Sequence, residues 1–142
     1  MKIKEISVGN YVRVNYGLGE GQIFKVERIV NNKEGGWVDL HNKEMDEDYS
    51  LGHFIKELDP VYIKDVIDKL GFERVTNGGF DYYEIYSDEF IDVTIEEYTD
   101  GLYLVNVSNN EFSFPTECKL LSSIHELQNF LTMCNADLKI EL

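Results

Sequence analysis

The sequence has little positive charge, few cysteines and no long hydrophobic run. It contains 13 Lys and Arg residues against 27 Asp and Glu residues, and its formal net charge is -14. This deficit of positive charge disfavours direct binding to nucleic acid, phosphates and anionic membranes, and it favours basic proteins as partners. The two cysteines, Cys118 and Cys134, cannot make a disulfide framework and are expected to be reduced thiols.

The lack of a long apolar run also bears on location. A helix needs about 20 consecutive apolar residues to cross a bilayer, and no segment of the sequence approaches this length. Residues 1–5 lack the apolar stretch that is typical of a secretory signal. We therefore expect a cytoplasmic protein with no membrane contact.

The negative charge is concentrated in the second part of the chain. Residues 1–58 carry 8 basic and 10 acidic residues, a net charge of -2, whereas residues 59–142 carry 5 and 17, a net charge of -12. Hydrophobic residues make up 43% of the chain, which is enough material for packed cores and argues against global disorder. The acidic part is therefore expected to be a folded module.

The first part of the chain has the pattern of short strands. Residues 11–14 alternate between apolar and polar types, and residues 22–30 and 37–40 are rich in apolar and β-branched residues. Glycine-rich segments at 17–21 and 31–36 separate these strands. Short strands that are joined by glycine-rich turns predict a small, open β-barrel.

The second part begins where the pattern changes at Asp59. Asp59 is a suitable N-cap and Pro60 a suitable first helical residue. The apolar residues that follow at helical spacing are Ile63, Val66, Ile67 and Leu70. Gly71 can end this helix in a left-handed conformation. A second helix is predicted to begin at Ser123, which can form a capping box with Glu126.

Strands are predicted between these two helices. They cover residues 72–75, 80–86, 90–98 and 102–108, and the alternating tail at 138–142 is expected to add a closing strand.

The predicted fold class is α+β, with two modules. Residues 1–58 are expected to form a small SH3-like β-barrel, and residues 59–142 an acidic antiparallel sheet with two helices. Because the junction near residues 56–60 is short, the barrel is expected to pack on the sheet module.

The motifs give little reason to expect bound cofactors or metals. Gly17, Gly19 and Gly21 resemble a phosphate-binding loop, but the segment that follows them reads as a strand and supplies no helix N-terminus. The three histidines and two cysteines include no close pair of metal ligands. The acidic run at 44–48 lacks the spacing of a calcium loop. We predict neither a metal site nor a cofactor.

Catalysis is the weakest of the functional hypotheses. Cys134 lies nine positions after His125, about two and a half helical turns away, so the two side chains are not expected to pair. Cys118 precedes the helix, and no serine lies in a Gly-x-Ser-x-Gly motif. The protein is therefore predicted not to be an enzyme.

The segment 80–98 is the best candidate for a binding surface. Alternation places apolar residues such as Ile91 and Val93 on one face of the expected hairpin, and carboxylates and aromatic rings on the other. Carboxylates can accept bidentate contacts from arginine, while the rings contribute contact area. Glu84 is expected to lie opposite or near Asp92, a pairing that destabilises the sheet. The predicted partner-binding residues are Tyr82, Glu84, Tyr86, Asp88, Glu89, Asp92, Glu96, Glu97, Tyr98 and Asp100.

Several segments carry a family resemblance. Residues 6–13 and 21–26 resemble the opening strands of small proteins from phages and prophages of Firmicutes, and the helix at 123–129, SIHELQN, resembles one that often closes such proteins. The segments at 70–73 and 81–84 are also similar. The resemblance implies an accessory protein of this kind, a group that includes inhibitors of host antiviral systems such as anti-CRISPR proteins.

Three functions remain open at this point. The first is a non-catalytic phage protein, located in the host cytoplasm, that binds and inhibits a basic host protein by presenting carboxylates in place of phosphates; a nuclease or nucleic-acid-binding defence complex fits this description. The second is a small-molecule binder, such as a sponge for nucleotide immune signals, with Arg13, Lys25 and Arg28 as the candidate contacts. The third is a structural accessory protein, which could be an oligomer.

Overall fold

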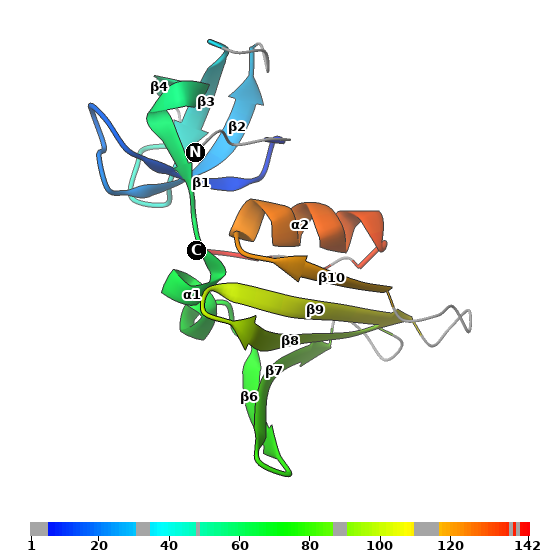
Figure 1. Cartoon of the computed structure of the whole chain (residues 1–142). Helices are drawn as coiled ribbons and strands as arrows, with labels where there is room; N and C mark the ends of the chain where they lie inside the picture. Colours follow the sequence, from blue (N-terminus) through cyan, green and yellow to red (C-terminus); the bar gives the residue numbers. More distant parts are fainter. Residues whose placement is uncertain are drawn as a thin grey trace. The chain divides into compact units, whose positions relative to one another are not determined.

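The computed structural model describes residues 6–30, 35–47, 49–86, 91–109, 117–136, 138 and 140–142. The chain divides into two compact units, Met1–Val61 and Tyr62–Leu142. Each unit has its own five-stranded antiparallel sheet (Figure 1). The predicted α+β class is confirmed, and the structure has two antiparallel sheets and two helices.

The first unit is a sheet of short strands. Its strands are β1 (Tyr11–Val14), β2 (Ile23–Ile29), β3 (Trp37–His41), β4 (Leu51–Phe54) and β5 (Leu58–Pro60), and a 3₁₀ turn, η1 (Ile55–Glu57), joins the last two. The strand order is β4-β3-β2-β1-β5, so β1 pairs with both β2 and β5. In the part of the chain that the structure describes, β4 and β5 lie at opposite edges, and the predicted barrel does not close.

Alternating apolar residues build the core of this unit. Val12, Val14, Val26, Val38 and Leu40 are all buried. In β2 the alternation is interrupted by a β-bulge between Val26 and Arg28. The bulge leaves two successive polar residues exposed, as expected when one residue is added to one strand of a pair.

The predicted start of the first helix is wrong. Asp59 and Pro60 belong to β5, where they pair with Arg13 and Val12 of β1. A proline is acceptable there because β5 is an edge strand, so the missing N–H costs no hydrogen bond of the sheet. Helix α1 begins later and covers only Ile63–Val66, followed by a 3₁₀ turn, η2 (Ile67–Lys69).

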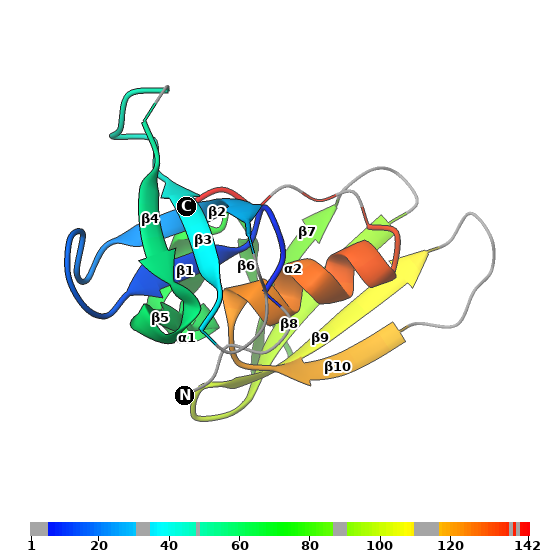
Figure 2. The same ribbon diagram turned by 90° about the horizontal axis from the view of Figure 1, so that it is seen from above.

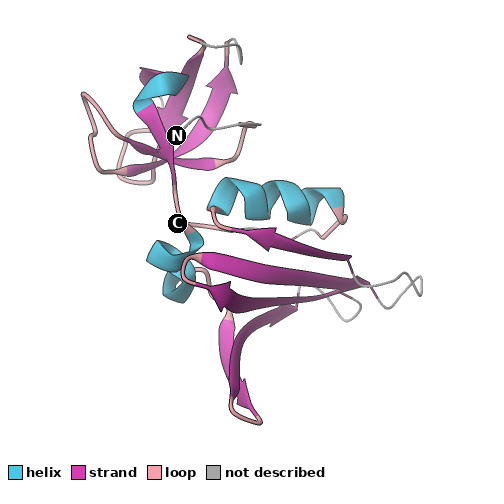
Figure 3. Cartoon of the chain, viewed as in Figure 1, coloured by secondary structure: helices cyan, strands magenta, loops and turns pink. Residues whose placement is uncertain are grey.

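The second unit is an antiparallel sheet with one long helix. Its strands are β6 (Glu73–Asn77), β7 (Phe80–Tyr86), β8 (Ile91–Thr99), β9 (Leu102–Asn109) and β10 (Glu117–Leu121), and helix α2 covers Ile124–Met133. The strand order, β10-β9-β8-β7-β6, follows the sequence (Figure 3). β10 was not predicted. The expected closing strand is not formed at the described residues 138 and 140–142, although Ile140 is buried.

Helix α2 covers one face of this sheet, as Figures 1 and 2 show together. Ile91, Val93 and Ile95 of β8 are buried on the covered face, which confirms the alternation predicted for this strand. From the helix, Ile124 and Leu127 are fully buried. No helix in the described part of the chain has the length and apolar character that a membrane span requires.

The start of α2 is the predicted capping box of Ser123 and Glu126. The Glu126 carboxylate accepts hydrogen bonds from the backbone N–H of Ser123 at 3.1 Å and from its hydroxyl at 2.9 Å. The backbone N–H of Ser122 also donates to it, at 3.1 Å. Burial by itself raises the pKa of Glu126, but these hydrogen bonds outweigh it, so the pKa is lowered overall.

We expect Glu126→Gln to destabilise the protein by about 1 kcal/mol at pH 7, because the charged acceptor of several hydrogen bonds is lost. A lowered folded pKa gives stability that is present above the unfolded pKa of about 4.3 and is lost as the pH falls through the folded value. The difference between the two proteins should therefore shrink below about pH 4. Urea unfolding at pH 7 and below about pH 4 measures this difference in stability, with the exposed Glu117→Gln as the control. A constant difference across this range would contradict the assignment.

Candidate functional site

The candidate site is the face of the second sheet that is turned away from α2, which we call the acidic face. Antiparallel register assigns its residues. At the positions whose side chains the structure describes, it includes Glu73 and Val75 of β6, Tyr82 and Glu84 of β7, Asp92, Thr94 and Glu96 of β8, Leu104, Asn106 and Ser108 of β9, and Cys118 and Leu120 of β10. None of these positions holds a lysine or arginine, whereas four hold carboxylates.

Asp92 lies in an unfavourable environment on this face. Glu84 is directly opposite Thr94, so Asp92 is its diagonal neighbour, and the expected proximity of the two acids is confirmed. Burial, and then the negative charge of Glu84, raise the pKa of Asp92. The Oδ1 atom of Asp92 is buried and has no hydrogen-bond partner in the described part of the chain. The charged form of Asp92 therefore costs folding free energy.

The neighbours of these acids are neutral. Tyr82 and Leu104 are half-buried. The side-chain amide of Asn106 lies 3.4 Å from the hydroxyl of Thr94, and donates a long hydrogen bond to it. An aromatic ring, an aliphatic side chain and short polar groups thus surround the carboxylates of this face. Such a surface provides contact area together with acceptors for a cationic group.

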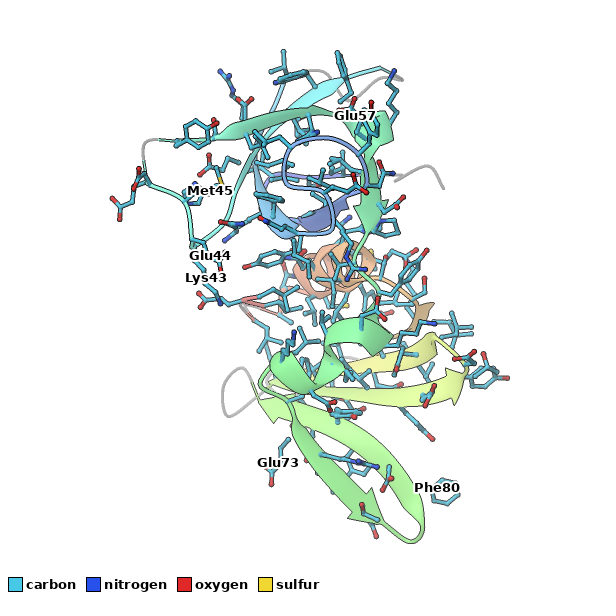
Figure 4. All side chains as sticks on the ribbon, turned by 90° about the vertical axis from the view of Figure 1, so that its left-hand side faces the viewer. Lys43, Glu44, Met45, Glu57, Glu73 and Phe80 are labelled. Carbon is cyan, nitrogen blue, oxygen red and sulfur yellow. The ribbon has the colours of Figure 1, made fainter. Side chains whose placement is uncertain are left out.

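The basic residue nearest in sequence does not neutralise the face. Arg74 follows Glu73 in β6, and alternation places it on the opposite side of the β6–β7 hairpin. There its guanidinium donates to the carboxylate of Asp81 at 2.6 Å. Figure 4 shows Glu73 on β6 and Phe80 at the tip of the same hairpin, where the Phe80 side chain is 69% exposed.

The ten residues predicted to bind a partner do not form one surface. Tyr82, Glu84, Asp92 and Glu96 lie on the acidic face, and the backbone of Tyr86 occupies a position of the same face. Asp88 and Glu89 lie outside the described residues.

The remaining three predicted residues lie elsewhere. Glu97 pairs with Tyr103, whose buried side chain is on the covered side of the sheet. Burial first, and then the nearby charge of Glu97, raise the pKa of Tyr103. A β-bulge between Glu97 and Thr99 displaces Tyr98 from the alternation, and Asp100 lies in the turn before β9. Glu97 thus continues the alternation of Ile91, Val93 and Ile95 on the covered side, whereas the bulge and the turn take Tyr98 and Asp100 out of that alternation.

Sequence reasoning also missed part of the acidic face. Glu73 joins it only because β6 pairs with β7 in the observed register. Leu104 and Asn106 could have been found from the alternation of residues 102–108. Cys118 and Leu120 could not, because the strand β10 that carries them was not predicted from the sequence.

The other candidate chemistries gain no support. Arg28 is held by Asp39, with its Nη2 2.6 Å from Oδ2, and the Lys25 ammonium lies 6.0 Å from the centre of the Tyr11 ring. Burial, and then the charge of Glu117, raise the pKa of the Cys134 thiol, which makes it a poorer nucleophile. Among the described residues, no group of three or more His, Cys, Asp or Glu side chains is arranged to hold a metal ion.

Comparison with known proteins does not assign the chain to a family: no family model, curated protein or solved structure matches it.

We expect Asp92→Asn to stabilise the protein by a few tenths of a kcal/mol to about 1 kcal/mol at pH 7, because it removes a partly buried charge next to Glu84. For an acid whose folded pKa is raised, the destabilisation is complete above the folded value and disappears as the pH falls towards the unfolded value of about 3.9. The gain should therefore vanish at low pH.

Urea unfolding at pH 7 and near pH 4 measures this effect. Glu96→Gln, on the same face but exposed, is the matched control and should change stability little. Loss of stability in Asp92→Asn at pH 7 would show that the Asp92 carboxylate is stabilising and would overturn the assignment.

Proposed function

We propose that the protein is a non-catalytic interaction protein whose acidic face binds a basic surface of a partner protein. The single observation that supports this most is the environment of Asp92, a partly buried carboxylate beside Glu84 that lowers stability. Groups with perturbed pKa values occur preferentially at functional sites, where a stability cost is tolerated.

The physical basis of binding follows from the same environment. A guanidinium group that approaches Asp92 and Glu84 would cancel their repulsion and supply donors for their oxygens. The free energy that this repulsion costs in the unbound protein would then be recovered on binding. Tyr82 and Leu104 beside the acids would add apolar contact area.

The wider biological context is part of the proposal. The resemblance of residues 6–13 and 123–129 to phage and prophage proteins supports a role in the cytoplasm of a bacterial host. The net charge of -12 over residues 59–142 supports a target that ordinarily binds nucleic acid, such as a nuclease of an antiviral defence system. The carboxylates would take the place of phosphates, and the protein itself would bind neither nucleic acid nor membranes.

We propose in addition that the first unit is an SH3-like open barrel. Three features support this: the last strand, β5, returns to pair with β1; a 3₁₀ turn connects β4 to β5; and a bulge bends β2, which lies between β1 and β3. Such bulges are typical of the rims of small barrels.

A nona-arginine peptide, used as a stand-in for a basic protein surface, tests the acidic face by calorimetry. We expect the double neutralisation Asp92→Asn/Glu96→Gln to weaken binding about tenfold, because two acceptors for arginine are lost. Affinity of the wild-type protein should also fall steeply as salt rises from about 50 to about 300 mM, because screening increases.

The matched control is Glu117→Gln/Glu141→Gln, which removes the same charge from exposed positions of the second unit outside the acidic face. It should leave the affinity almost unchanged. Equal weakening by both double variants would mean that the peptide responds to net charge alone, and the acidic face would be rejected as the binding site.

A further inference from the structure

The first unit contains a cavity of about 280 Å³ between two loops, one joining β1 to β2 and the other joining β3 to β4. Phe24 and Leu51 form its apolar floor, Leu18 lies on one wall, and Met45 and Tyr49 lie on the other. The volume is at the lower limit for drug-sized ligands. It suits a single large side chain.

The β1–β2 wall is held in place by a buried histidine. The Nε2 atom of His53 lies 2.8 Å from the carbonyl oxygen of Leu18, and its Nδ1 lies 3.1 Å from Oε2 of Glu57. Burial raises the pKa of Glu57, but hydrogen bonds from His53 and from the backbone of Phe54 outweigh it and lower the pKa overall. The Glu57 carboxylate thus orients the imidazole of His53, and the imidazole in turn holds the β1–β2 loop at Leu18.

Gly19 brings this wall close to the cavity floor. Its φ is +83°, and a Cβ atom at this position would lie 2.8 Å from Cζ of Phe24. A side chain at position 19 would therefore collide with the floor, and glycine leaves that space open.

The β3–β4 wall is also ordered by its own hydrogen bonds. The backbone N–H of Glu44 donates to the side chain of Asn42, and that of Met45 donates to the Asn42 carbonyl, both at 3.1 Å. Nδ1 of His41 lies 3.0 Å from the carbonyl oxygen of Tyr49. Figure 4 shows Glu44 and Met45 next to each other on this loop. The cavity is therefore formed before any ligand binds.

The charge around the cavity selects the sign of the ligand. Glu44 lines it, and no lysine or arginine is among the lining residues. Exposed Glu20, Asp46 and Glu47 lie on the same two loops, against a single described lysine, Lys43. An anionic ligand such as a nucleotide is disfavoured here, whereas an apolar chain that ends in a cation is favoured.

The openness of the site favours a side chain carried by a protein over a free metabolite. Leu18 is 69% exposed and Tyr49 is 54% exposed, so both walls are open to solvent. A residue that is attached to a polypeptide can enter from that side. Lysine and arginine combine an aliphatic stem with a cationic head, and arginine adds planar donors that match a carboxylate.

We propose that this cavity binds an arginine side chain of a partner protein, with the aliphatic stem against Phe24 and Leu51 and the guanidinium at the carboxylate of Glu44. The proposal rests on the proposed function for the partner, which is basic. It adds a second contact, on a unit that has a net charge of only -2 over residues 1–58.

The test is an NMR titration of the full chain with N-acetyl-arginine methylamide, compared with its citrulline counterpart, which has nearly the same shape and no charge. We expect saturable shifts of the backbone amides of Gly19, Met45 and Leu51. Affinity for the arginine compound should exceed that for the citrulline compound about fivefold, as for a charge-assisted contact at a solvated site.

Two matched variants test the role of Glu44. Glu44→Gln should reduce the affinity for the arginine compound to that of the citrulline compound, whereas Glu47→Gln, which removes a charge from the same loop outside the cavity lining, should not. Leu18→Ser should weaken both compounds equally, because it removes the apolar wall.

The results also separate this inference from the acidic face. Asp92→Asn/Glu96→Gln should leave the shifts in the cavity unchanged. Shifts confined to the second unit, or equal affinities of the wild-type protein and Glu44→Gln, would overturn the cavity proposal and leave the nona-arginine result for the acidic face standing.

Discussion

The two-residue period of β8 is the constraint on which the second unit depends. Ile91, Val93 and Ile95 point into the core beneath α2, and this requires the residues between them to point to the other side. A slip of one residue would put Asp92 into the core and expose three branched apolar side chains. The hydrophobic core therefore fixes the position of the acids, even though the acids repel one another.

The charged neighbours of the carboxylates differ between parts of the chain. Asp39 is paired with Arg28, and Asp81 with Arg74, each at 2.6 Å. On the acidic face, by contrast, Asp92 has another carboxylate as its charged neighbour. Arg28 and Arg74 thus pair with acids away from that face, and none of the positions assigned to the face holds a lysine or arginine. A surface of this kind is complementary to a cationic partner, and the complementarity favours fast and selective association.

The loops of the first unit place an acid in a different environment, beside an apolar cavity. The glycines of the β1–β2 loop adopt positive φ values, which lets the loop fold over Phe24. The imidazole of His53 forms a hydrogen bond with the carbonyl oxygen of Leu18 in this loop. Glu44 then lies beside an apolar cavity rather than on a flat surface. An acidic group next to apolar contact area distinguishes one kind of cation from another, because the stem of the ligand must fit as well as its charge.

Local sequence signals determined a definite part of this protein. The alternation at 91–95, the capping box of Ser123 and Glu126, and the left-handed Gly71, with φ of +75°, all follow from neighbours in the chain and occur as predicted. They are short-range features, because a strand or a helix start fixes them within a few residues. They were sufficient to place Asp92 and Glu96 on the face opposite the core.

Tertiary structure alone decided the rest, because strand pairing joins residues that are distant in sequence. The helix signal at Asp59 and Pro60 was overridden by pairing with β1, which satisfies the backbone of an edge strand. Glu73 joined the acidic face through the register of β6 with β7, and a bulge after Glu97 took Tyr98 out of the alternation of β8. The cavity at Glu44 exists only because two loops, some twenty residues apart in the chain, lie over the same core.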